Sequence, residues 1–193
     1  IVGHEALTRW LDGTPPATAF ALARLAGLGD DLELATIEAS VAASRLLPPD
    51  GWLSLNVTPA LIDNPRLAEL VARTPRDLVL EIRVDQPVPD APAHRRTADR
   101  LGSRVRLAID QVGTDPRSLR AITELRPAFV KPGLRLIRDI ERRPEQQERL
   151  ALLRDAAEAV GGELVVEGIE TDTTQRRLRT GGVRLGQGYL LGR

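Results

Sequence analysis

The chain of 193 residues has no cysteine, no methionine and no excess of either charge. The lack of cysteine excludes disulfide bonds and thiolate metal sites. Lys plus Arg and Asp plus Glu both number 27, so the formal net charge is zero. A neutral chain has no general attraction for the phosphates of long DNA or RNA. A small anionic ligand needs only local positive charge and is compatible with this composition.

Long hydrophobic runs and a signal peptide are also missing. No apolar run approaches the roughly 20 residues of a membrane-spanning helix. The chain begins at Ile1 inside a predicted strand and contains no Met, so we expect it to be part of a longer protein. Its length and its hydrophobic fraction of 42% fit one globular domain with a sizeable core.

Segments with strand patterns alternate with segments of helical periodicity along the whole chain. Strands are predicted near 1–8, 52–57, 78–84, 105–110, 127–131, 163–167 and 183–191. Helices are predicted from a cap at Asp30 or Asp31 to Pro48, after Thr58, over 145–160 and over 171–178. The proline-rich segment 85–94 is predicted to be a loop that exposes His94. This alternation predicts βαβ units and a mostly parallel sheet.

Polar side chains of the kind that bind metals stand at or near the ends of these strands. They are Glu5, Asn56, Glu81, Asp110, Lys131 and Glu167. A single acid at a strand end is more commonly a loop cap or a salt-bridge partner, but six in one structural place indicate a site. In a βα barrel the carboxyl ends of all strands meet at one mouth, whereas an open sheet gathers its ligands at one switch point. We therefore expect a barrel with its functional site at the mouth.

The residue types at these strand ends indicate a hard cation. Carboxylate and amide oxygens without histidine suit Mg²⁺ or Mn²⁺ rather than zinc. Such cations usually serve phosphate chemistry, because they neutralise phosphoryl oxygens and acidify a bound water. Lys131 would add a positive charge for that water. Arg9 is predicted to share the strand face of Glu5 and so to reach a phosphate at the rim.

Seven motifs in order resemble the EAL domain of bacterial cyclic-di-GMP phosphodiesterases. They are GHEALTRW (3–10), LSLNV (53–57), LVLEI (78–82), AIDQVGT (108–114), FVK (129–131), VVEGIET (165–171) and GQGYLLGR (186–193). The resemblance covers 1–193 as a single domain. It implies an α/β fold, a modified (β/α)8 barrel of TIM type with one antiparallel strand, and a first strand that would precede this chain.

The resemblance also implies a role for each matching residue. The metal ligands would be Glu5, Asn56, Glu81 and Asp110. The catalytic residues, which position and activate water, would be Lys131 and Glu167. The residues that bind the substrate would be Leu7, Arg9, Glu170 and Gln187. The implied reaction opens cyclic di-GMP to the linear dinucleotide pGpG. The expected setting is cytoplasmic signalling, alone or as the cytoplasmic domain of a larger membrane-anchored protein, with homodimers and further signalling domains as partners.

Three positions depart from the family pattern. The second acid of the paired-Asp loop is Gln111, the Glu expected three residues after Glu81 is Val84, and the Asp expected two residues after the lysine is Gly133. A neutral amide binds a hard cation less well than a carboxylate does, so we expect at most one well-formed Mg²⁺ or Mn²⁺ site.

Two functions follow from the same residues. We expect a degenerate domain that binds cyclic di-GMP or a protein partner, with weak or lost hydrolysis. The alternative is an active metal-dependent phosphodiesterase, because all six strand-end residues are intact. A scaffold that binds no nucleotide is a third reading, which the presence of Arg9 and Gln187 disfavours.

Overall fold

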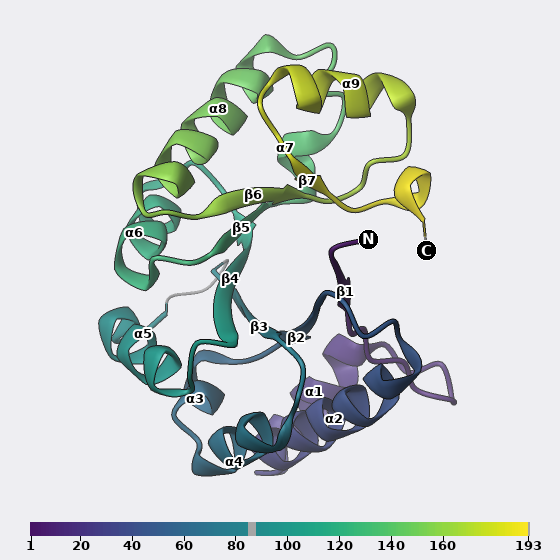
Figure 1. Ribbon diagram of the computed structural model, residues 1–193, viewed down its shortest axis with the longest axis vertical. Helices are drawn as coiled ribbons and strands as arrows, with labels where there is room; N and C mark the ends of the chain where they lie inside the picture. Colours follow the sequence, from purple (N-terminus) through teal and green to yellow (C-terminus); the bar gives the residue numbers. More distant parts are fainter. Residues whose placement is uncertain (85–87, 193) are drawn as a thin grey trace. The chain divides into compact units, whose positions relative to one another are not determined.

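A computed structural model describes residues 1–84 and 88–192, in which strands and helices alternate as predicted (Figure 1). Packing divides the chain into two compact units: Ile1–Glu81 with Thr97–Arg106, and Ile82–Arg96 with Leu107–Arg193. The division passes through strand β3 (Leu78–Arg83) and strand β4 (Val105–Val112). Each unit has its own strands, helices and apolar core.

The first unit holds three adjacent parallel strands. β1 (Gly3–Glu5) pairs with β2 (Trp52–Asn56), and β2 pairs with β3. The register places Glu5 beside Ser54 and Asn56 beside Glu81. β2 and β3 are buried on both faces, as in a parallel sheet covered by helices. Parallel pairing brings the carboxyl ends of these strands to one edge.

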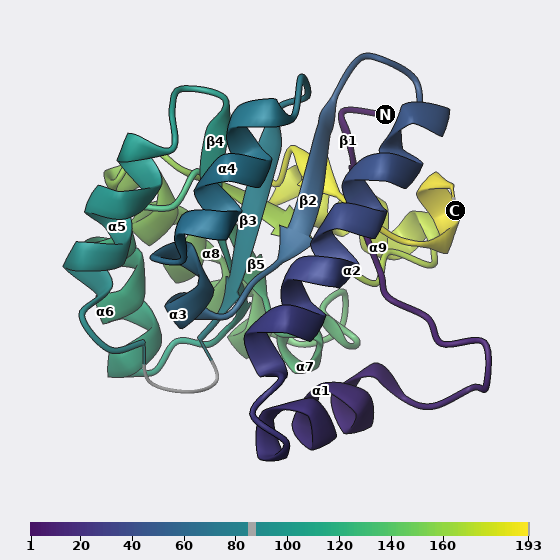
Figure 2. The ribbon, with the colours of Figure 1, turned by 90° about the horizontal axis from the view of Figure 1, so that it is seen from below.

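Helices α1 (Pro16–Leu25), α2 (Gly29–Ala43), α3 (Pro59–Ile62) and α4 (Pro65–Arg73) belong to the first unit, with a short 3₁₀ turn η1 (Ser44–Leu46). The helix predicted after Asp30 or Asp31 is observed as α2, which buries Leu34 and Ile37. The predicted cap is wrong: Leu28 occupies the N-cap, and Asp30 and Asp31 lie in the first turn, where their charge favours the helix dipole. Figure 2 shows α1 lying across one end of α2.

The second unit holds the strand order β4, β5 (Phe129–Pro132), β6 (Glu163–Val166) and β7 (Leu185–Gly186), all parallel. Its helices are α6 (Pro116–Leu125), α7 (Leu134–Ile137), α8 (Pro144–Ala159) and α9 (Asp172–Thr180), followed by the turn η2 (Tyr189–Leu191). α8 packs against β5, β6 and α6 (Figure 1) and buries Leu150, Leu153 and Ala157. The predicted cap of α9 is confirmed, because the Thr171 hydroxyl accepts a hydrogen bond from Thr174 N.

Several predicted boundaries are wrong. β1 ends at Glu5 rather than at residue 8, and β7 covers two residues where 183–191 was predicted. Helix α5 (Ala91–Arg100) begins inside the predicted loop 85–94, of which 85–87 lie outside the described residues. His94 is therefore buried on α5, with 8% of its surface exposed, and not solvent-exposed as predicted. The loop prediction rested on the proline content of this segment, but proline is compatible with the first turn of a helix.

The described residues fit the expected α/β class. The pairings within each unit are parallel, and the antiparallel strand stays a prediction. Among residues 1–84 and 88–192, no helix combines the length and the apolar character that crossing a membrane requires.

Candidate functional site

Three of the predicted metal ligands come together at the carboxyl edge of β1, β2 and β3 in the first unit. Asn56 Nδ2 donates a hydrogen bond of 3.3 Å to Glu5 Oε1, and Asn56 stands in register with Glu81. Glu81 is only 3% exposed, and its carboxylate accepts a hydrogen bond from the Ser54 hydroxyl. We call Glu5, Ser54, Asn56 and Glu81 the acidic edge. Its donor set of carboxylate, amide and hydroxyl oxygens suits a hard cation.

The backbone fixes the acidic edge from strand to strand. Ala6 N donates to Ser54 O at 2.9 Å, and Val57 N donates to Glu81 O at 2.9 Å. These bonds continue the ladder one residue past β1 and β2. The side chains of Glu5 and Asn56 therefore leave the sheet at its last paired positions, where alternation directs residues two apart to the same face.

A further acid is connected to this edge and was missed by the sequence analysis. Glu33 of α2 accepts hydrogen bonds from Thr58 N at 2.5 Å and from Thr58 Oγ1 at 3.0 Å. Glu33 is 6% exposed, and this burial raises the pKa of its carboxyl group, while the bonds from Thr58 oppose the rise. Its position beside Leu34, on the buried stripe of α2, is the sequence feature that would have identified it.

Leu7 and Arg9 lie beyond the end of β1. Both are exposed, and Arg9 Nη1 donates to the neighbouring Thr8 O at 2.8 Å. The predicted face shared by Arg9 and Glu5 is wrong, because the strand ends at Glu5 and alternation does not extend to residue 9. Whether Leu7 and Arg9 contact a ligand stays a prediction.

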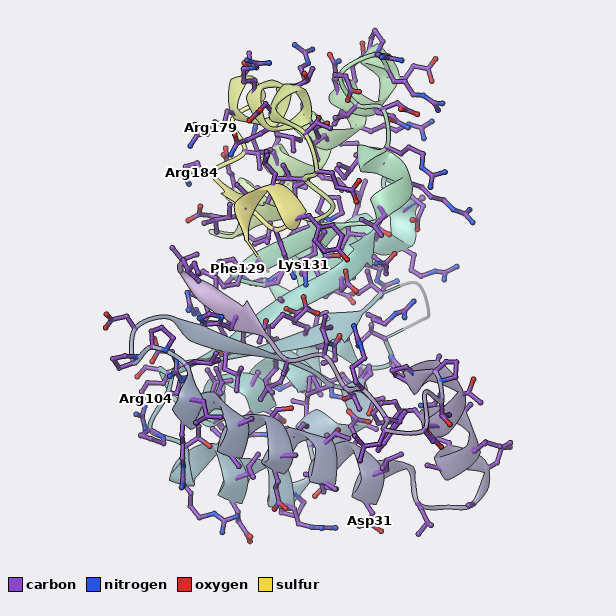
Figure 3. The ribbon with its side chains drawn as sticks, turned by 90° about the vertical axis from the view of Figure 1, so that its right-hand side faces the viewer. Asp31, Arg104, Phe129, Lys131, Arg179 and Arg184 are labelled. Carbon is purple, nitrogen blue, oxygen red and sulfur yellow. The ribbon has the colours of Figure 1, made fainter. Side chains whose placement is uncertain are left out.

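In the second unit, Lys131 and Glu167 form an ion pair with Nζ and Oε1 at 2.6 Å. Lys131 lies on β5, two residues after Phe129 (Figure 3), and is 3% exposed. Glu167 follows the last residue of β6, and 20% of its side chain is exposed. A buried ammonium requires a charged partner, and the ion pair holds the two side chains together at the ends of β5 and β6.

Asp110 and the residue after it form a bulge in β4. The register of β4 against β5 shifts between Ile109 and Val112, which leaves an extra residue on β4. Gln111 has a φ of 59°, in the left-handed region. Its backbone N donates to Asp110 Oδ1 at 2.7 Å, and its Nε2 lies 3.4 Å and 3.5 Å from the two carboxylate oxygens. The carboxylate of Asp110 thus faces the amide groups of residue 111.

The loop after the bulge is held by two side chains that the sequence analysis did not single out. Asp115 caps α6 by accepting hydrogen bonds from Arg117 N and Ser118 N, each at 3.1 Å, and from Ser118 Oγ at 2.7 Å. Ser118 Oγ in turn accepts from Gly113 N at 3.1 Å. The bonds from Ser118 lower the pKa of Asp115. The pair Asp115-Pro116 is a recognisable helix start.

The two remaining predicted residues lie near the end of the chain. Glu170 and Gln187 are both exposed. The backbone of Gln187 is anchored, since its N donates to Val166 O at 2.8 Å and its O accepts from Ile169 N at 3.1 Å. Their predicted contacts with a dinucleotide stay predictions.

In neither unit do three His, Asp or Glu side chains of the described residues gather closely enough to hold a metal on their own. Asn56 takes the place of a third acid at the acidic edge. A cavity of about 140 Å³ between α8 and α9 is lined by Leu150, Arg154 and Leu178, among others. It contains none of the predicted site residues and is smaller than the roughly 300 Å³ at which ligand pockets usually start.

The profile of the EAL domain family matches residues 1–193. The chain belongs to the EAL domain family. The resemblance read from seven motifs is thereby confirmed, and so is the expected α/β fold of TIM-like type.

The relatives of this EAL domain include enzymes and nucleotide complexes. The cyclic di-GMP phosphodiesterase RocR of Pseudomonas aeruginosa is 27% identical over 214 residues, which cover all of this chain and 53% of RocR. The calcium and cyclic di-GMP complex of Klebsiella pneumoniae BlrP1 has a TM-score of 0.83 at 26% identity and covers 97% of this chain and 50% of that one. The EAL domain of P. aeruginosa FimX bound to cyclic di-GMP has a TM-score of 0.77 at 25% identity, covering 97% of this chain and 81% of that one. The chain thus spans about half the length of RocR and BlrP1.

Proposed function

We propose that this EAL domain binds cyclic di-GMP and hydrolyses it weakly or not at all. The observation that carries the proposal is the placement of Gln111, whose amide lies against the Asp110 carboxylate. A second acid here would repel Asp110, and a cation would be needed to bring the two together. Gln111 instead places N–H groups against the Asp110 carboxylate, so this carboxylate does not need a cation to offset repulsion from a second acid.

The metal part of the proposal concerns one ion. The ligands that the resemblance assigns are Glu5, Asn56 and Glu81 at the acidic edge, and Asp110 on β4. Their oxygens fit Mg²⁺ or Mn²⁺, although Asn56 presents Nδ2 to Glu5 and its amide would have to turn to offer Oδ1. A bound ion would polarise a phosphoryl oxygen as a Lewis acid. BlrP1 complexes with calcium and with manganese support a divalent cation without fixing which one.

Other residues of the chain would act on the nucleotide directly. Lys131 and Glu167, which form a direct ion pair at 2.6 Å, would together position and activate the hydrolytic water. Leu7, Arg9, Glu170 and Gln187 would contact the dinucleotide. A location in the cytoplasm, pairing into homodimers and the presence of further signalling domains belong to the proposal on the same family grounds.

An active phosphodiesterase is the alternative, and one observation favours it. The pair formed by Lys131 and Glu167 is intact and largely buried, as a group that activates water would require. In addition, RocR, which is similar to this chain along its full length, is a cyclic di-GMP phosphodiesterase.

Calorimetric titration with cyclic di-GMP, with and without Mg²⁺ or Mn²⁺, separates these functions when the same mixtures are then analysed for pGpG. We expect binding with little or no linear product. Rapid formation of pGpG would select the active enzyme. Absence of both binding and product would overturn the proposal and leave the scaffold.

A further inference from the structure

An acid that is buried in the core of the first unit is attached to the loop that follows Asn56. Glu33 lies on the side of α2 that carries Leu34 and Ile37 into the core, and all three are at most 6% exposed. α2 packs against β2 (Figure 2). An apolar side chain would fill this position without the cost of removing a carboxylate from water. Packing therefore gives no reason for an acid at position 33.

The reason lies in what the carboxylate holds. Both of its oxygens accept hydrogen bonds from Thr58, from the backbone N at 2.5 Å and from Oγ1 at 3.0 Å. Thr58 occupies the N-cap of α3, yet its side chain makes no capping bond to that helix, because the hydroxyl is directed to Glu33. The chain thus leaves β2 at a point fixed by another helix.

Thr58 stands two residues after Asn56, and the residue between them is also fixed. Val57 is 6% exposed, and its N donates to Glu81 O at 2.9 Å. Beyond Thr58, Pro59 sets the first turn of α3. The Asn56 side chain is exposed and donates one hydrogen bond, to Glu5 Oε1, so its position depends on Glu5 and on the backbone that carries it. An anchored backbone lowers the entropy that binding must remove from such a side chain.

We propose that Glu33 is a positioning residue, which acts through Thr58 to hold Asn56 ready for a cation and its nucleotide at the acidic edge. This inference rests on the proposed function. It places a supporting part of the site on α2, a helix that lies outside the seven motifs of the resemblance.

Three substitutions test the role of Glu33. Glu33→Leu removes both acceptors and keeps an apolar filling for the core. Glu33→Gln keeps the size and one acceptor for Thr58 N while it removes the charge. Glu38→Leu is the matched control, because Glu38 is an exposed acid on the same helix.

Three measurements are made on each variant of the whole chain: amide hydrogen exchange at Thr58 without ligand, calorimetric affinity for Mn²⁺ and cyclic di-GMP, and thermal unfolding. In Glu33→Leu we expect exchange at Thr58 to rise and the Kd for cyclic di-GMP to rise about tenfold, with cooperative unfolding retained. In Glu33→Gln and Glu38→Leu we expect Kd values within about twofold of the wild type. If Glu33→Gln binds cyclic di-GMP like the wild type, Thr58 requires a hydrogen-bond acceptor at position 33 and not a negative charge.

The proposal is overturned if Glu33→Leu binds cyclic di-GMP like the wild type although Thr58 exchanges faster. It is overturned equally if exchange at Thr58 does not change, or if Gln binds as weakly as Leu. Should Glu33→Leu fail to fold, Thr58→Val removes one of the two hydrogen bonds from the other side, and an unchanged Kd there would refute the proposal. A wild type that binds neither Mn²⁺ nor cyclic di-GMP refutes the proposed function, whereas faster exchange in Glu33→Leu would still show that Glu33 anchors Thr58.

Discussion

The loops that follow Asn56 and Asp110 are both held by a carboxylate, but the two carboxylates come from different places. In the first unit Glu33 reaches Thr58 from a helix 25 residues earlier in the chain. In the second unit Asp115 lies within the loop and binds residues two and three positions ahead. Glu33 is buried and its pKa is raised, whereas Asp115 is exposed and its pKa is lowered.

This difference shows how burial decides what a carboxylate contributes to stability. Asp115 stays in water and gains hydrogen bonds, so its charged form favours the folded state. Glu33 gains hydrogen bonds of the same kind, but burial outweighs them and its charge opposes folding. In the folded state the ionised form of Glu33 is therefore disfavoured relative to its protonated form, whereas the ionised form of Asp115 is favoured.

The largest expected effect concerns the amide next to Asp110. Gln111→Asp restores the second acid of the loop, and we expect turnover of cyclic di-GMP with Mn²⁺ to rise by on the order of tenfold or more, because a charged ligand binds a hard cation far better than an amide. Product formation is followed by chromatography of pGpG.

Val84 supplies the second part of that experiment. Val84 is 2% exposed and its N donates to Asp110 O at 3.0 Å, so Val84→Glu alone should lower stability by burying an acid. The double variant Gln111→Asp with Val84→Glu should hydrolyse at least as fast as Gln111→Asp. If neither variant gains turnover over the wild type, the proposal that Gln111 limits hydrolysis is wrong.

A smaller effect is expected on the stability of the second loop. Asp115→Ala removes the cap of α6 and should lower the free energy of unfolding by about 1 kcal/mol. Asp115→Asn keeps an acceptor for Arg117 N and Ser118 N and should lose less. Urea denaturation of both variants measures the difference, and equal losses would show that charge rather than capping matters.

The pH dependence of stability should differ in sign between the two carboxylates. The pKa of Asp115 is lowered from its ordinary value of 3.8, so its contribution is present above pH 3.8 and is lost as the pH falls through the lower folded value. The gap in unfolding free energy between the wild type and Asp115→Asn should therefore narrow on acidification. A gap that is constant with pH would contradict the assigned shift.

Glu33 should give the opposite slope. The pKa of its carboxyl group is raised in the folded state from an ordinary 4.5. At a pH between 4.5 and the raised pKa, the folded chain therefore keeps a proton that the unfolded chain has lost. Stability then falls as the pH rises from 4.5 through the raised folded value. Relative to Glu33→Gln, the wild type should become less stable across that window in urea titrations. An increase instead would mean that the bonds from Thr58 outweigh burial.

The sequence predicted the parts of the site that depend on strand ends. Glu5, Asn56 and Glu81 converge in the first unit, and Lys131 meets Glu167 in the second, because parallel pairing determines where strand ends lie. The α/β class and the EAL family followed from the same pattern. Side chains alternate between faces only within a strand. The predicted position of Arg9 was therefore wrong, because β1 ends at Glu5.

What the sequence did not predict depends on contacts between distant residues or on local backbone geometry. The bond between Glu33 and Thr58 joins two helices and a strand end, and no short-range pattern encodes it. α6 carried a local signature at Asp115-Pro116 that was overlooked. The bulge at Gln111 depends on how β4 pairs with β5, which the identity of residue 111 does not reveal.

The left-handed backbone at position 111 has a consequence for substitution there. At a φ of 59° a β-branched side chain is strongly disfavoured, whereas glycine, asparagine and aspartate are accepted readily. These tolerated residues differ widely in their attraction for a divalent ion. Under the proposed function, substitution at this one position would change the affinity for a divalent ion while the main chain keeps its course.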